Sequence, residues 1–449
     1  MMLELESHPF GDWQTTLEKA QRLIGHKTGI IKTLVELPLE TDDPPLFLWV
    51  AELADTSRYS PLKPASGGSG TAAIRGIAQA KAIGEAVERY CAAMYADDDL
   101  ILADYRSIAS DAIDPRTFPL YSEREYAHSD GYLSRFIEDV PIRWVKGYSL
   151  TKQRAILVPA SFVFTPYRFH NSTERIYSAI STGLACANSV EEAVFSGLCE
   201  VVERDAIMIM WLNRLSMPRV SLASTQSERI QALLRKWAAC RAELHIVNIT
   251  TDVGIPTFFG VVIDRSGSGP AVCVGAAAHL NPKLAVAKAI EETAHGRVYA
   301  KRLMRQRPKI AQEVNLTKVT NLNDHVLLYC TPATSARLRF VYSSTQEIEI
   351  NSILNRFSEN DVLANIHTCI ELLAARCLEV IVVDITTPDI AGVGFHVVKV
   401  LIPGMQPLSV GTKYLCLGGQ RLYQVPYILG YTSTPTTEDS INRDPHPFP

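Results

Sequence analysis

Two distant stretches of the chain repeat the same run of charged residues inside an apolar helical pattern. The run Glu-x-Val-Glu-Arg occurs in "GEAVERYCA" at residues 84–92 and again in "CEVVERDAI" at residues 199–207. Residues three and four apart share one face of an α-helix, so each run places two glutamates beside an apolar stripe. Because the flanking residues are apolar, we expect these acids to be largely buried. A buried carboxylate needs a cation or a shifted pKa.

The second run belongs to a longer acidic stripe, on a helix that we expect over residues 189–213. On this helix Glu192, Glu200 and Glu203 fall within about 80° of one another at 100° per residue. A solvated helix face usually mixes lysine with glutamate, but no lysine balances this stripe, and like charges at this spacing repel. The pattern therefore favours a binding site over an ordinary charged surface.

A third helical pattern, over residues 283–306, repeats the theme more weakly, with Glu292 and His295 on one stripe. Carboxylates that converge from several helices suit Mg²⁺, which prefers oxygen ligands. Arginines beside them suit phosphate, which guanidinium groups bind through two hydrogen bonds. The three helices together predict a site for a metal ion and a phosphorylated ligand.

The usual nucleotide-binding motifs are absent from the sequence. There is no GxxxxGK[ST] loop, and "SGGSGTAAIRG" has Ala73 where a GxGxxG loop needs its third glycine. The GxSxG and HExxH motifs of hydrolases and metalloproteases do not occur either. A nucleotide would therefore need a site of a different kind, and a metal-dependent hydrolase lacks its histidine ligands.

Composition excludes several further classes. The 449 residues carry a net charge of −4 and a pI of about 6.3, which argues against non-specific binding of nucleic acid. The first residues lack the basic and apolar regions of a signal peptide, and apolar runs such as "LEVIVVDI" are too short to span a membrane. None of the nine cysteines form a CxxC pair, as expected for reduced thiols of a cytoplasmic protein.

Helices and strands are mixed along the chain rather than strictly alternating, which indicates an α+β fold. We expect an N-terminal segment, residues 1–60, that packs on a main domain, residues 61–430, followed by a C-terminal arm, residues 431–449. A Pro/Gly/Ser-rich connector at residues 60–70 joins the first two parts. The elements expected from periodicity are helices at about 14–25, 72–97, 189–213, 283–306 and 359–376, and strands within 46–53, 142–150, 154–164, 254–264, 270–280, 378–385 and 396–404.

Four blocks of the sequence, taken in order, resemble the YcaO family. They are residues 66–92, which begin "SGGSGTAAIRG", residues 181–211, which begin "STGLACANSVEEAV", residues 285–297, "AVAKAIEETAHGR", and residues 382–408, which begin "VVDITTPDIAG". The resemblance implies a YcaO-type fold, in which mixed sheets pack with helices around an ATP site that has no P-loop. It also implies ATP and Mg²⁺ as cofactors.

Site residues follow from the resemblance by position. The implied metal ligands are Glu85, Glu88, Glu200, Glu203 and Glu292. The implied nucleotide and phosphate contacts are Ser69, Lys81, Arg89, Asn188, Glu192, Arg204 and Arg297. Many members of the family have lysine in the glycine-rich loop where this chain has Ser69, and some have serine where it has Lys81.

The family is known best for ATP-dependent cyclodehydration, in which a Cys, Ser or Thr side chain of a ribosomal precursor peptide becomes a thiazoline or oxazoline. The azoline-forming members end in PxPxP, as this chain does in "PHPFP". Composition alone would predict a loose arm here. Proline fixes φ, so residues 445–449 are expected to be stiff and extended over roughly 15 Å. The resemblance implies that the carboxylate of Pro449 is catalytic, as a base or a hydrogen-bond acceptor.

The same resemblance implies partners. We expect a precursor peptide as substrate, a separate E1-like or related leader-binding protein, a flavin dehydrogenase that oxidises azolines, and a homodimer, with neither nucleic acid nor membrane involved. Two alternatives stay open at this point. One is a family member that forms a thioamide or an amidine macrocycle, although such members generally lack the PxPxP ending. The other is a non-catalytic leader-binding scaffold, which would not need the paired glutamates.

Overall fold

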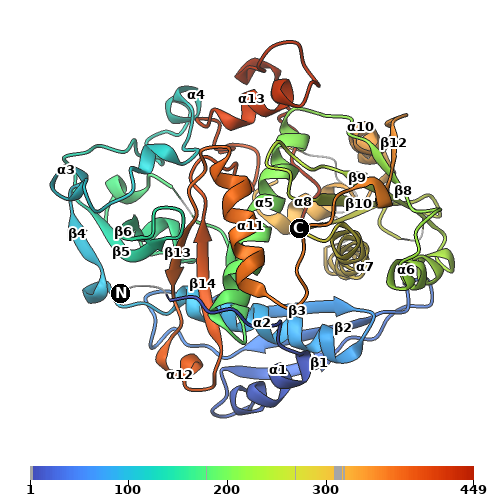
Figure 1. Ribbon diagram of the computed structural model, residues 1–449, viewed down its shortest axis with the longest axis horizontal. Coiled ribbons are helices and arrows are strands. Elements are labelled where there is room, and N and C mark those ends of the chain that lie inside the picture. Colours follow the sequence, from blue (N-terminus) through green and yellow to red (C-terminus); the bar gives the residue numbers. More distant parts are fainter. Residues whose placement is uncertain (1–3, 178, 268, 308–315, 317–318) are drawn as a thin grey trace.

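The computed structural model of the chain describes residues 4–449 except residues 178, 268, 308–315 and 317–318. It confirms an α+β fold in which three sheets surround a central helix, α5 (Val190–Leu212) (Figure 1). Four short helices lie in the connections between the larger elements: α3 (Tyr105–Ile108), α4 (Glu123–Ala127), α9 (Pro332–Ser335) and α10 (Arg339–Tyr342). Among the described residues, no helix has both the length and the apolar character needed to cross a membrane.

The first sheet is antiparallel, in the order β1-β2-β3, and carries helix α2 (Arg75–Ala93) on one face. Its strands, together with the first helix, are β1 (Ile31–Glu36), β2 (Phe47–Leu53), β3 (Gly67–Ala72) and α1 (Trp13–Ala20). The sheet thus pairs two strands of the N-terminal segment with a strand from the predicted connector.

The connector prediction was wrong for residues 67–70, which belong to strand β3, and the reason is the close approach of α2. A Cβ atom on Gly68 would lie 2.4 Å from the backbone nitrogen of Ala86, and one on Gly70 would lie 2.3 Å from the carbonyl oxygen of Ala78. The glycines therefore let a helix lie directly on a strand. A glycine-rich composition of this kind is otherwise typical of a loop.

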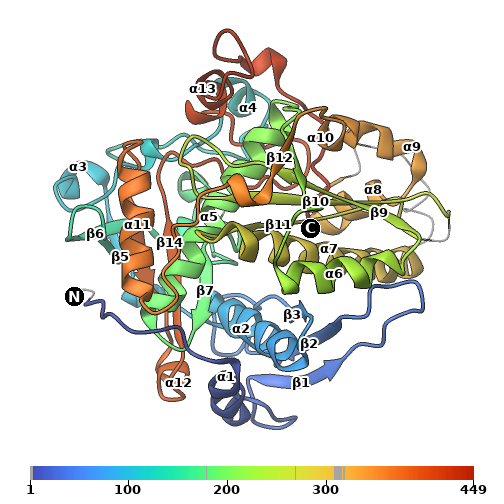
Figure 2. The same cartoon turned by 45° about the vertical axis from the view of Figure 1, so that its right-hand side comes forward.

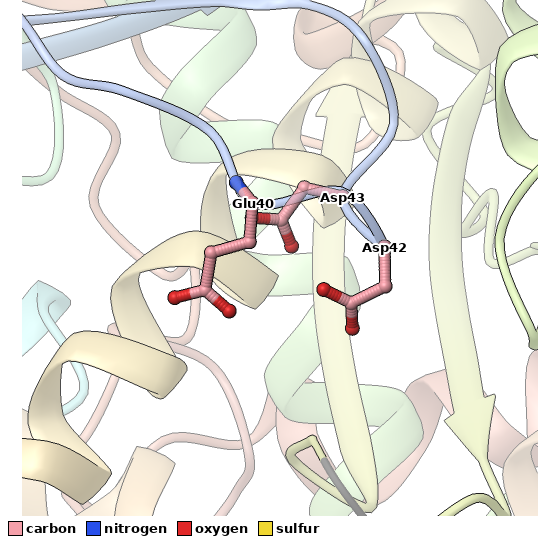
Figure 3. Close-up of side chains that lie close together, drawn as sticks. All are labelled: Glu40, Asp42 and Asp43. Carbon is pink, nitrogen blue, oxygen red and sulfur yellow. Dashed lines mark hydrogen bonds between the residues drawn. The ribbon is translucent and has the colours of Figure 1, made fainter.

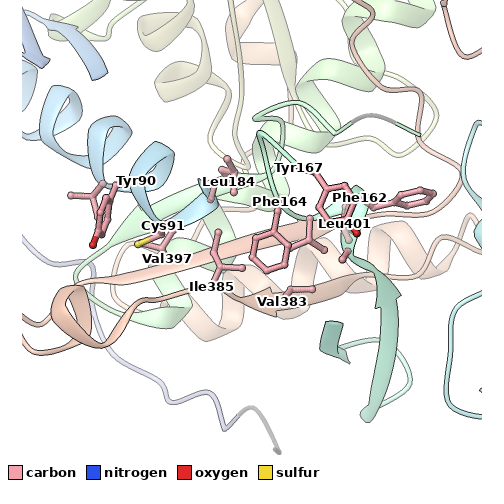
Figure 4. Packing of buried hydrophobic residues seen from close by; sticks show 14 of the residues in the cluster. Tyr90, Cys91, Phe162, Phe164, Tyr167, Leu184, Val383, Ile385, Val397 and Leu401 are labelled. Atoms are coloured by element: carbon pink, nitrogen blue, oxygen red, sulfur yellow. The ribbon is translucent and has the colours of Figure 1, made fainter. Parts of the chain in front are cut away.

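The second sheet has six strands, in the order β4-β5-β13-β14-β7, with β6 paired to β5. Its strands are β4 (Ile101–Ala103), β5 (Ile142–Ser149), β6 (Arg154–Pro159), β7 (Leu184–Ala187), β13 (Ile381–Asp384) and β14 (His396–Leu401), and the short α12 (Pro388–Ala391) connects the last two. Figure 4 shows Tyr90 and Cys91 at the end of α2 in the same apolar cluster as Val383 and Val397 of this sheet.

The third sheet has the order β11-β10-β9-β8-β12. Its elements are β8 (Arg219–Ser221), β9 (Ala242–Asn248), β10 (Thr257–Asp264), β11 (Val272–Ala278) and β12 (Glu347–Glu349), with α6 (Glu228–Ala238) and α7 (Pro282–Gln306) (Figure 2). Alternate residues of β10 point to opposite faces. Phe258 and Val262 pack towards α6 and α7, whereas Phe259 and Val261 pack towards α5.

Helix α5 lies between the second and third sheets, and most of its residues are buried, although it carries an acidic stripe. Its first half packs on β14 and α11 (Val362–Ala374), and its second half packs on β10 and β11. Ser189 caps its N-terminus by accepting a hydrogen bond from the backbone of Glu192 at 3.1 Å. Charged residues on this helix are therefore held inside the molecule.

The C-terminal arm also enters the interior. After α13 (Arg421–Ile428), the chain turns back, and residues 445–448 are buried close to α8 (Leu322–Leu328) and the end of α5. Both ribbon views place the C-terminus inside the outline of the molecule (Figures 1 and 2). The loose arm that composition predicts is thus wrong for these residues, because long-range contacts order them.

Candidate active site

Helices α2, α5 and α7 bring the predicted acids together between the three sheets. Burial, then the charge of Glu200 and then that of Glu85, raise the pKa of Glu88 from its usual 4.5 to about 8. Burial also raises the pKa of Glu200, and Arg204 opposes that rise. The two Glu-x-Val-Glu-Arg runs therefore form one cluster, which holds more negative charge than its surroundings compensate.

Glu85 is tied to the glycine-rich strand. Its Oε2 accepts hydrogen bonds from the backbone N–H of Ser69 at 2.6 Å and from the Ser69 hydroxyl at 3.3 Å, and its Oε1 accepts one from Arg89. Arg89 also donates to the carbonyl oxygen of Gly67 at 2.6 Å. Strand β3 and helix α2 thus fix three predicted site residues, Ser69, Glu85 and Arg89, in one group.

Backbone groups just before α5 hold Glu88 and Glu200, which are both partly buried. Glu88 accepts a hydrogen bond from the N–H of Cys186 at 2.9 Å, and Glu200 accepts one from the N–H of Gly183 at 3.1 Å. Gly183 has φ +84°, and a Cβ atom there would lie 2.2 Å from the carbonyl oxygen of Val400. Only glycine can make this turn without strain, so the turn that aims an N–H at Glu200 depends on it.

Arg204 bridges the acids of its own helix. Its guanidinium pairs with Glu200 at 3.1 Å and with Glu203, and it also lies in the electrostatic field of Glu292 and Glu85. Burial lowers the pKa of Arg204 overall, and Glu200, Glu292 and Glu85 oppose the fall. The arginine therefore joins the acids of α2, α5 and α7 into one electrostatic unit.

Glu292 of α7 faces α2 across the site. The Lys81 ammonium lies 3.4 Å from Glu292 and 3.6 Å from Glu291, and it donates to the carbonyl oxygen of Thr71 at 2.9 Å. Burial raises the pKa of Glu292, but Lys81 and His295 together outweigh it and bring the pKa to about 2. Glu292 is thus anionic and already paired with a cation, unlike Glu88.

The donor set fits Mg²⁺. Glu85, Glu88 and Glu200 offer hard carboxylate oxygens, and the raised pKa of Glu88 shows that one more positive charge would be stabilising there. Arg89, Arg204 and Lys81 lie around these acids and are the side chains that suit phosphate oxygens. The site can therefore hold a divalent cation between carboxylates and an anion beside it.

Arg297 is not part of this cluster. It is 1% exposed, and its guanidinium lies 2.8 Å from Asp42 and 2.8 Å from Asp264, with Asp43 at 3.5 Å. Lys301, one turn further along α7, also pairs with Asp42 and Asp43, at 2.7 Å each. The structure therefore places the predicted phosphate contact in a buried ion-pair network on another side of α7.

Among the described residues, the tightest group of carboxylate oxygens is Glu40, Asp42 and Asp43, on the loop between β1 and β2 (Figure 3). Arg297, Lys301 and Arg305 already neutralise this group. These ion pairs connect the N-terminal segment to α7.

Asn188 and Glu192 lie at the N-terminal end of α5, and Glu192 is about 12 Å along the helix axis from Glu200. Glu192 accepts hydrogen bonds from the backbone of Gly11 and Asn188, and the Asn188 side chain donates to Thr16 at 2.8 Å. These two residues therefore contact the N-terminal segment, at some distance from the acidic cluster of α2, α5 and α7.

One site residue has no clear signal in the sequence. Lys399 lies in the middle of β14, is 2% exposed, and donates to the carbonyl oxygens of Ile180 and Thr182 at 2.7 Å each. Burial lowers its pKa to about 8, and the charge of Glu200 opposes the fall. Lys399 also borders a cavity of about 50 Å³. The one signal in the sequence that could have indicated Lys399 is its position as a single lysine within an apolar strand pattern.

The C-terminal arm reaches the same arginine. The Arg204 guanidinium carbon lies 4.4 Å from the centre of the Phe448 ring, which is 6% exposed. Phe448 also lies near Phe259 of β10, with 6.4 Å between ring centres. Pro449, the exposed final residue, follows directly. The structure thus brings the PxPxP ending to the helix that carries Glu200 and Glu203.

Several solved structures share the fold of this chain. A heterocyclase solved in complex with substrate and cofactor is 27% identical with a TM-score of 0.84, and the heterocyclase TruD is 26% identical with a TM-score of 0.74. Both matches cover all of this chain, which spans 59% and 56% of those longer chains. YcaO from Methanopyrus kandleri, bound with AMPPCP and Mg²⁺, shares the fold at 19% identity and a TM-score of 0.64.

An uncharacterized protein of Methanothermobacter thermautotrophicus is 28% identical over 346 residues, which make up 76% of this chain and 82% of that protein. Residues 69–406 match the family described as YcaO cyclodehydratase, ATP- and Mg²⁺-binding. That match contains both Glu-x-Val-Glu-Arg runs and the third acidic helix. The chain therefore belongs to the YcaO cyclodehydratase family.

Proposed function

We propose that this protein is an ATP-dependent cyclodehydratase that converts Cys, Ser or Thr residues of a ribosomal precursor peptide into thiazolines or oxazolines. The observation that carries the proposal is the contact between Phe448 of the PxPxP arm and Arg204, which pairs with Glu200 and Glu203. Family membership and the likeness to two heterocyclases support it.

The proposed reaction removes one molecule of water for each ring. The side-chain thiol or hydroxyl of the substrate gives its proton to a base and attacks the preceding backbone carbonyl carbon. The former carbonyl oxygen then takes the terminal phosphoryl group of ATP, which leaves ADP. Phosphate then leaves, and the amide nitrogen loses its proton as the C=N bond forms. ATP and Mg²⁺, when bound, supply the phosphoryl group and neutralise the charge that develops on it.

Each group of residues has a distinct part in this proposal. Glu85, Glu88, Glu200 and Glu203 hold the metal, with Glu292 as a further acid at the edge of the cluster. Arg89, Arg204, Lys81 and Ser69 surround these acids and bind phosphate oxygens. Asn188 and Glu192, which contact the N-terminal segment, are proposed as contacts of the nucleotide.

The terminal carboxylate of Pro449 is proposed as the group that accepts a proton from the substrate. A C-terminal carboxylate has a reference pKa of about 3.3–3.7 and is charged at pH 7. Its neighbour Phe448 is held against Arg204, so the charge is delivered on a stiff segment with little ordering left to do. The PxPxP ending supports azoline formation over the thioamide and amidine chemistries, whose enzymes generally lack it.

The proposed partners are a precursor peptide, a separate E1-like or related leader-binding protein, and a flavin dehydrogenase that oxidises the azolines. A homodimer and a cytoplasmic location complete the proposal. The family resemblance supports them.

The test is reconstitution. The chain is combined with ATP, Mg²⁺, and a short Cys/Ser/Thr-rich peptide and E1-like protein encoded beside its own gene. We expect a loss of about 18 Da, one water, for each ring, with one phosphate released. An unmodified peptide in the complete mixture, or a gain in mass from exchange of oxygen for sulfur, would contradict the proposal.

A further inference from the structure

Three consecutive backbone carbonyls of the C-terminal arm accept hydrogen bonds from side chains of the interior. The indole N–H of Trp211 donates to the carbonyl of Asp444 at 2.8 Å, and the Tyr329 hydroxyl donates to that of Pro445 at 2.6 Å. His325 Nδ1 lies 2.8 Å from the carbonyl of His446. These donors come from the end of α5, from α8 and from the residue that follows α8. We call Trp211, His325 and Tyr329 the arm seat.

A proline-rich segment needs a seat of this kind. Pro445, Pro447 and Pro449 have no N–H, and an extended polyproline conformation makes no internal hydrogen bonds. The carbonyl oxygens are therefore the backbone groups by which such a segment can be held. A buried carbonyl without a donor would cost about 1–3 kcal/mol. The arm seat satisfies three of them in a row.

The direction of the His325 hydrogen bond is determined by its second partner. The backbone N–H of Gly411 donates to His325 Nε2 at 2.8 Å, so the proton of a neutral ring lies on Nδ1 and points to the arm. Burial lowers the pKa of His325 to about 4, which keeps the ring neutral at pH 7. The ring of His446 lies against it, with 4.3 Å between ring centres.

Further contacts set the register of the arm around the seat. Arg337 pairs with Asp444 at 2.5 Å, and His446 Nε2 donates to the carbonyl oxygen of Ser409 at 2.7 Å. Two residues beyond His446, Phe448 reaches Arg204. The arm seat therefore determines which residue of the arm reaches Arg204 and the acidic cluster.

We propose that Tyr329 and His325 are positioning residues, which hold the arm so that Phe448 and the carboxylate of Pro449 lie at Arg204. Neither residue touches the reacting atoms. Only the role given to the carboxylate rests on the proposed function. The hydrogen bonds that hold the arm are a structural property and do not depend on it. This positioning role predicts that loosening the seat frees the arm while the nucleotide site stays intact.

The first test measures how often the arm leaves its seat. A carboxypeptidase that accepts a C-terminal proline can remove the exposed Pro449 from either form, but it can remove the buried Phe448 only from the open form. The rate of phenylalanine release therefore follows the open population. Tyr329→Phe removes one hydrogen bond, and we expect about fivefold faster release, equivalent to about 1 kcal/mol. Tyr423→Phe is the matched control, because the Tyr423 hydroxyl donates to the carbonyl of Leu417 at 2.7 Å, outside the seat. Equal release rates in the two variants would overturn the proposal.

The second test separates positioning from general stability. In reconstituted cyclisation, the kcat of the double variant Tyr329→Phe/His325→Leu should fall by about 25-fold, because two hydrogen bonds of about fivefold each are lost. Its KM for ATP should not change. The double variant Tyr329→Phe/His325→Gln, whose amide restores a donor and an acceptor, should recover part of this loss. A raised KM with unchanged kcat, or no difference between the leucine and glutamine variants, would overturn the positioning role.

The third test supplies the arm in trans. A chain that ends at Arg443 is mixed with the synthetic peptide NRDPHPFP, which corresponds to residues 442–449. The peptide should restore cyclisation to the truncated chain but not to the same chain with Tyr329→Phe/His325→Leu. Rescue of both chains alike would contradict the seat. If no form of the protein cyclises a peptide, the proposed function fails, whereas the carboxypeptidase result still decides whether the seat holds the arm.

Discussion

The ring of Phe448 faces the guanidinium of Arg204, whose central carbon lies 4.4 Å from the ring centre. The same guanidinium pairs with Glu200 and Glu203. A contact between the penultimate residue and the middle of α5 joins the PxPxP arm to the acidic cluster. A cation over an aromatic face is worth roughly 0.5–2 kcal/mol, depending on how far it is desolvated. The arm and the acids can therefore act as one site.

Replacing Glu200 with glutamine should abolish ATP turnover. The variant keeps the size of the side chain but removes a charge from the acidic cluster, and we expect at least about a 100-fold loss, as for other losses at metal sites. Phosphate release with Mg²⁺ and ATP is the measurement. Glu228→Gln, an exposed acid in the first turn of α6, is the control and should behave as wild type. Unchanged phosphate release in the Glu200 variant would remove Glu200 from the site.

Deleting Phe448 and Pro449 should remove cyclisation and leave nucleotide binding in place. The acids and arginines that face the nucleotide lie on α2, α5 and α7, whereas the deletion removes only the carboxylate and the ring over Arg204. Ring formation is followed by mass spectrometry and ATP binding by calorimetry.

A chain with one added glycine after Pro449 serves as the companion variant to this deletion. It keeps both deleted residues and moves the charge by about 3.5 Å. It should lose cyclisation as well if the position of the charge matters. Full activity in either variant would refute the role of the terminal carboxylate.

Glu88 should make the metal-free protein less stable as the pH rises. Its pKa is about 8 in the folded protein, against 4.5 as the ordinary value, so the folded state holds the proton more tightly. The stability that comes from this proton is complete below about pH 4.5 and is lost as the pH rises through 8. Glu88→Gln cannot lose a proton, so its melting temperature relative to wild type should rise between pH 5 and pH 8.

Mg²⁺ supplies the control for the Glu88 prediction. The metal should raise the melting temperature of wild type at pH 8, because it favours the ionised carboxylate and releases the proton. It should have much less effect on Glu88→Gln. An identical pH dependence in the two proteins without metal would contradict the burial of Glu88 among like charges.

Arg297→Met should unfold the protein more readily and leave the KM for ATP unchanged. The change leaves Asp264 and Asp43 buried with less compensating charge, and removing one partner of a buried pair typically costs about 3–5 kcal/mol. Arg305→Met is the control, because Arg305 is 64% exposed where it pairs with Glu40, and exposed pairs contribute about 1 kcal/mol or less. Denaturant unfolding measures both variants. A raised KM with unaltered stability would return Arg297 to the phosphate site.

Local patterns predicted the main helices well. The helix expected over residues 189–213 is observed as Val190–Leu212, and the one expected over 283–306 is observed as Pro282–Gln306. Helical periodicity and capping depend on neighbours within a few residues, so one sequence is enough to read them. The pairing of Glu200 with Arg204 is of the same kind, because i and i+4 side chains lie together on any helix.

Local composition led to a wrong expectation at residues 67–70, where glycines that are typical of a loop form part of strand β3 under a helix. Arg297 on α7 is a second position where local sequence does not reveal the contacts. Its helix was predicted correctly, but its partners Asp42 and Asp264 are distant in sequence, and nothing near Arg297 reveals them. Which face of a helix meets which strand is decided by packing.

The fold class, the acidic stripes on three helices and the stiffness of the PxPxP ending can be predicted without a structure, because these properties arise from residues close together along the chain. Only the folded protein reveals that the stripes converge, that Lys399 lies in the electrostatic field of Glu200, and that Trp211, Tyr329 and His325 hold the arm. These are contacts between residues up to several hundred positions apart. They form only when burial of apolar surface brings the three sheets around α5.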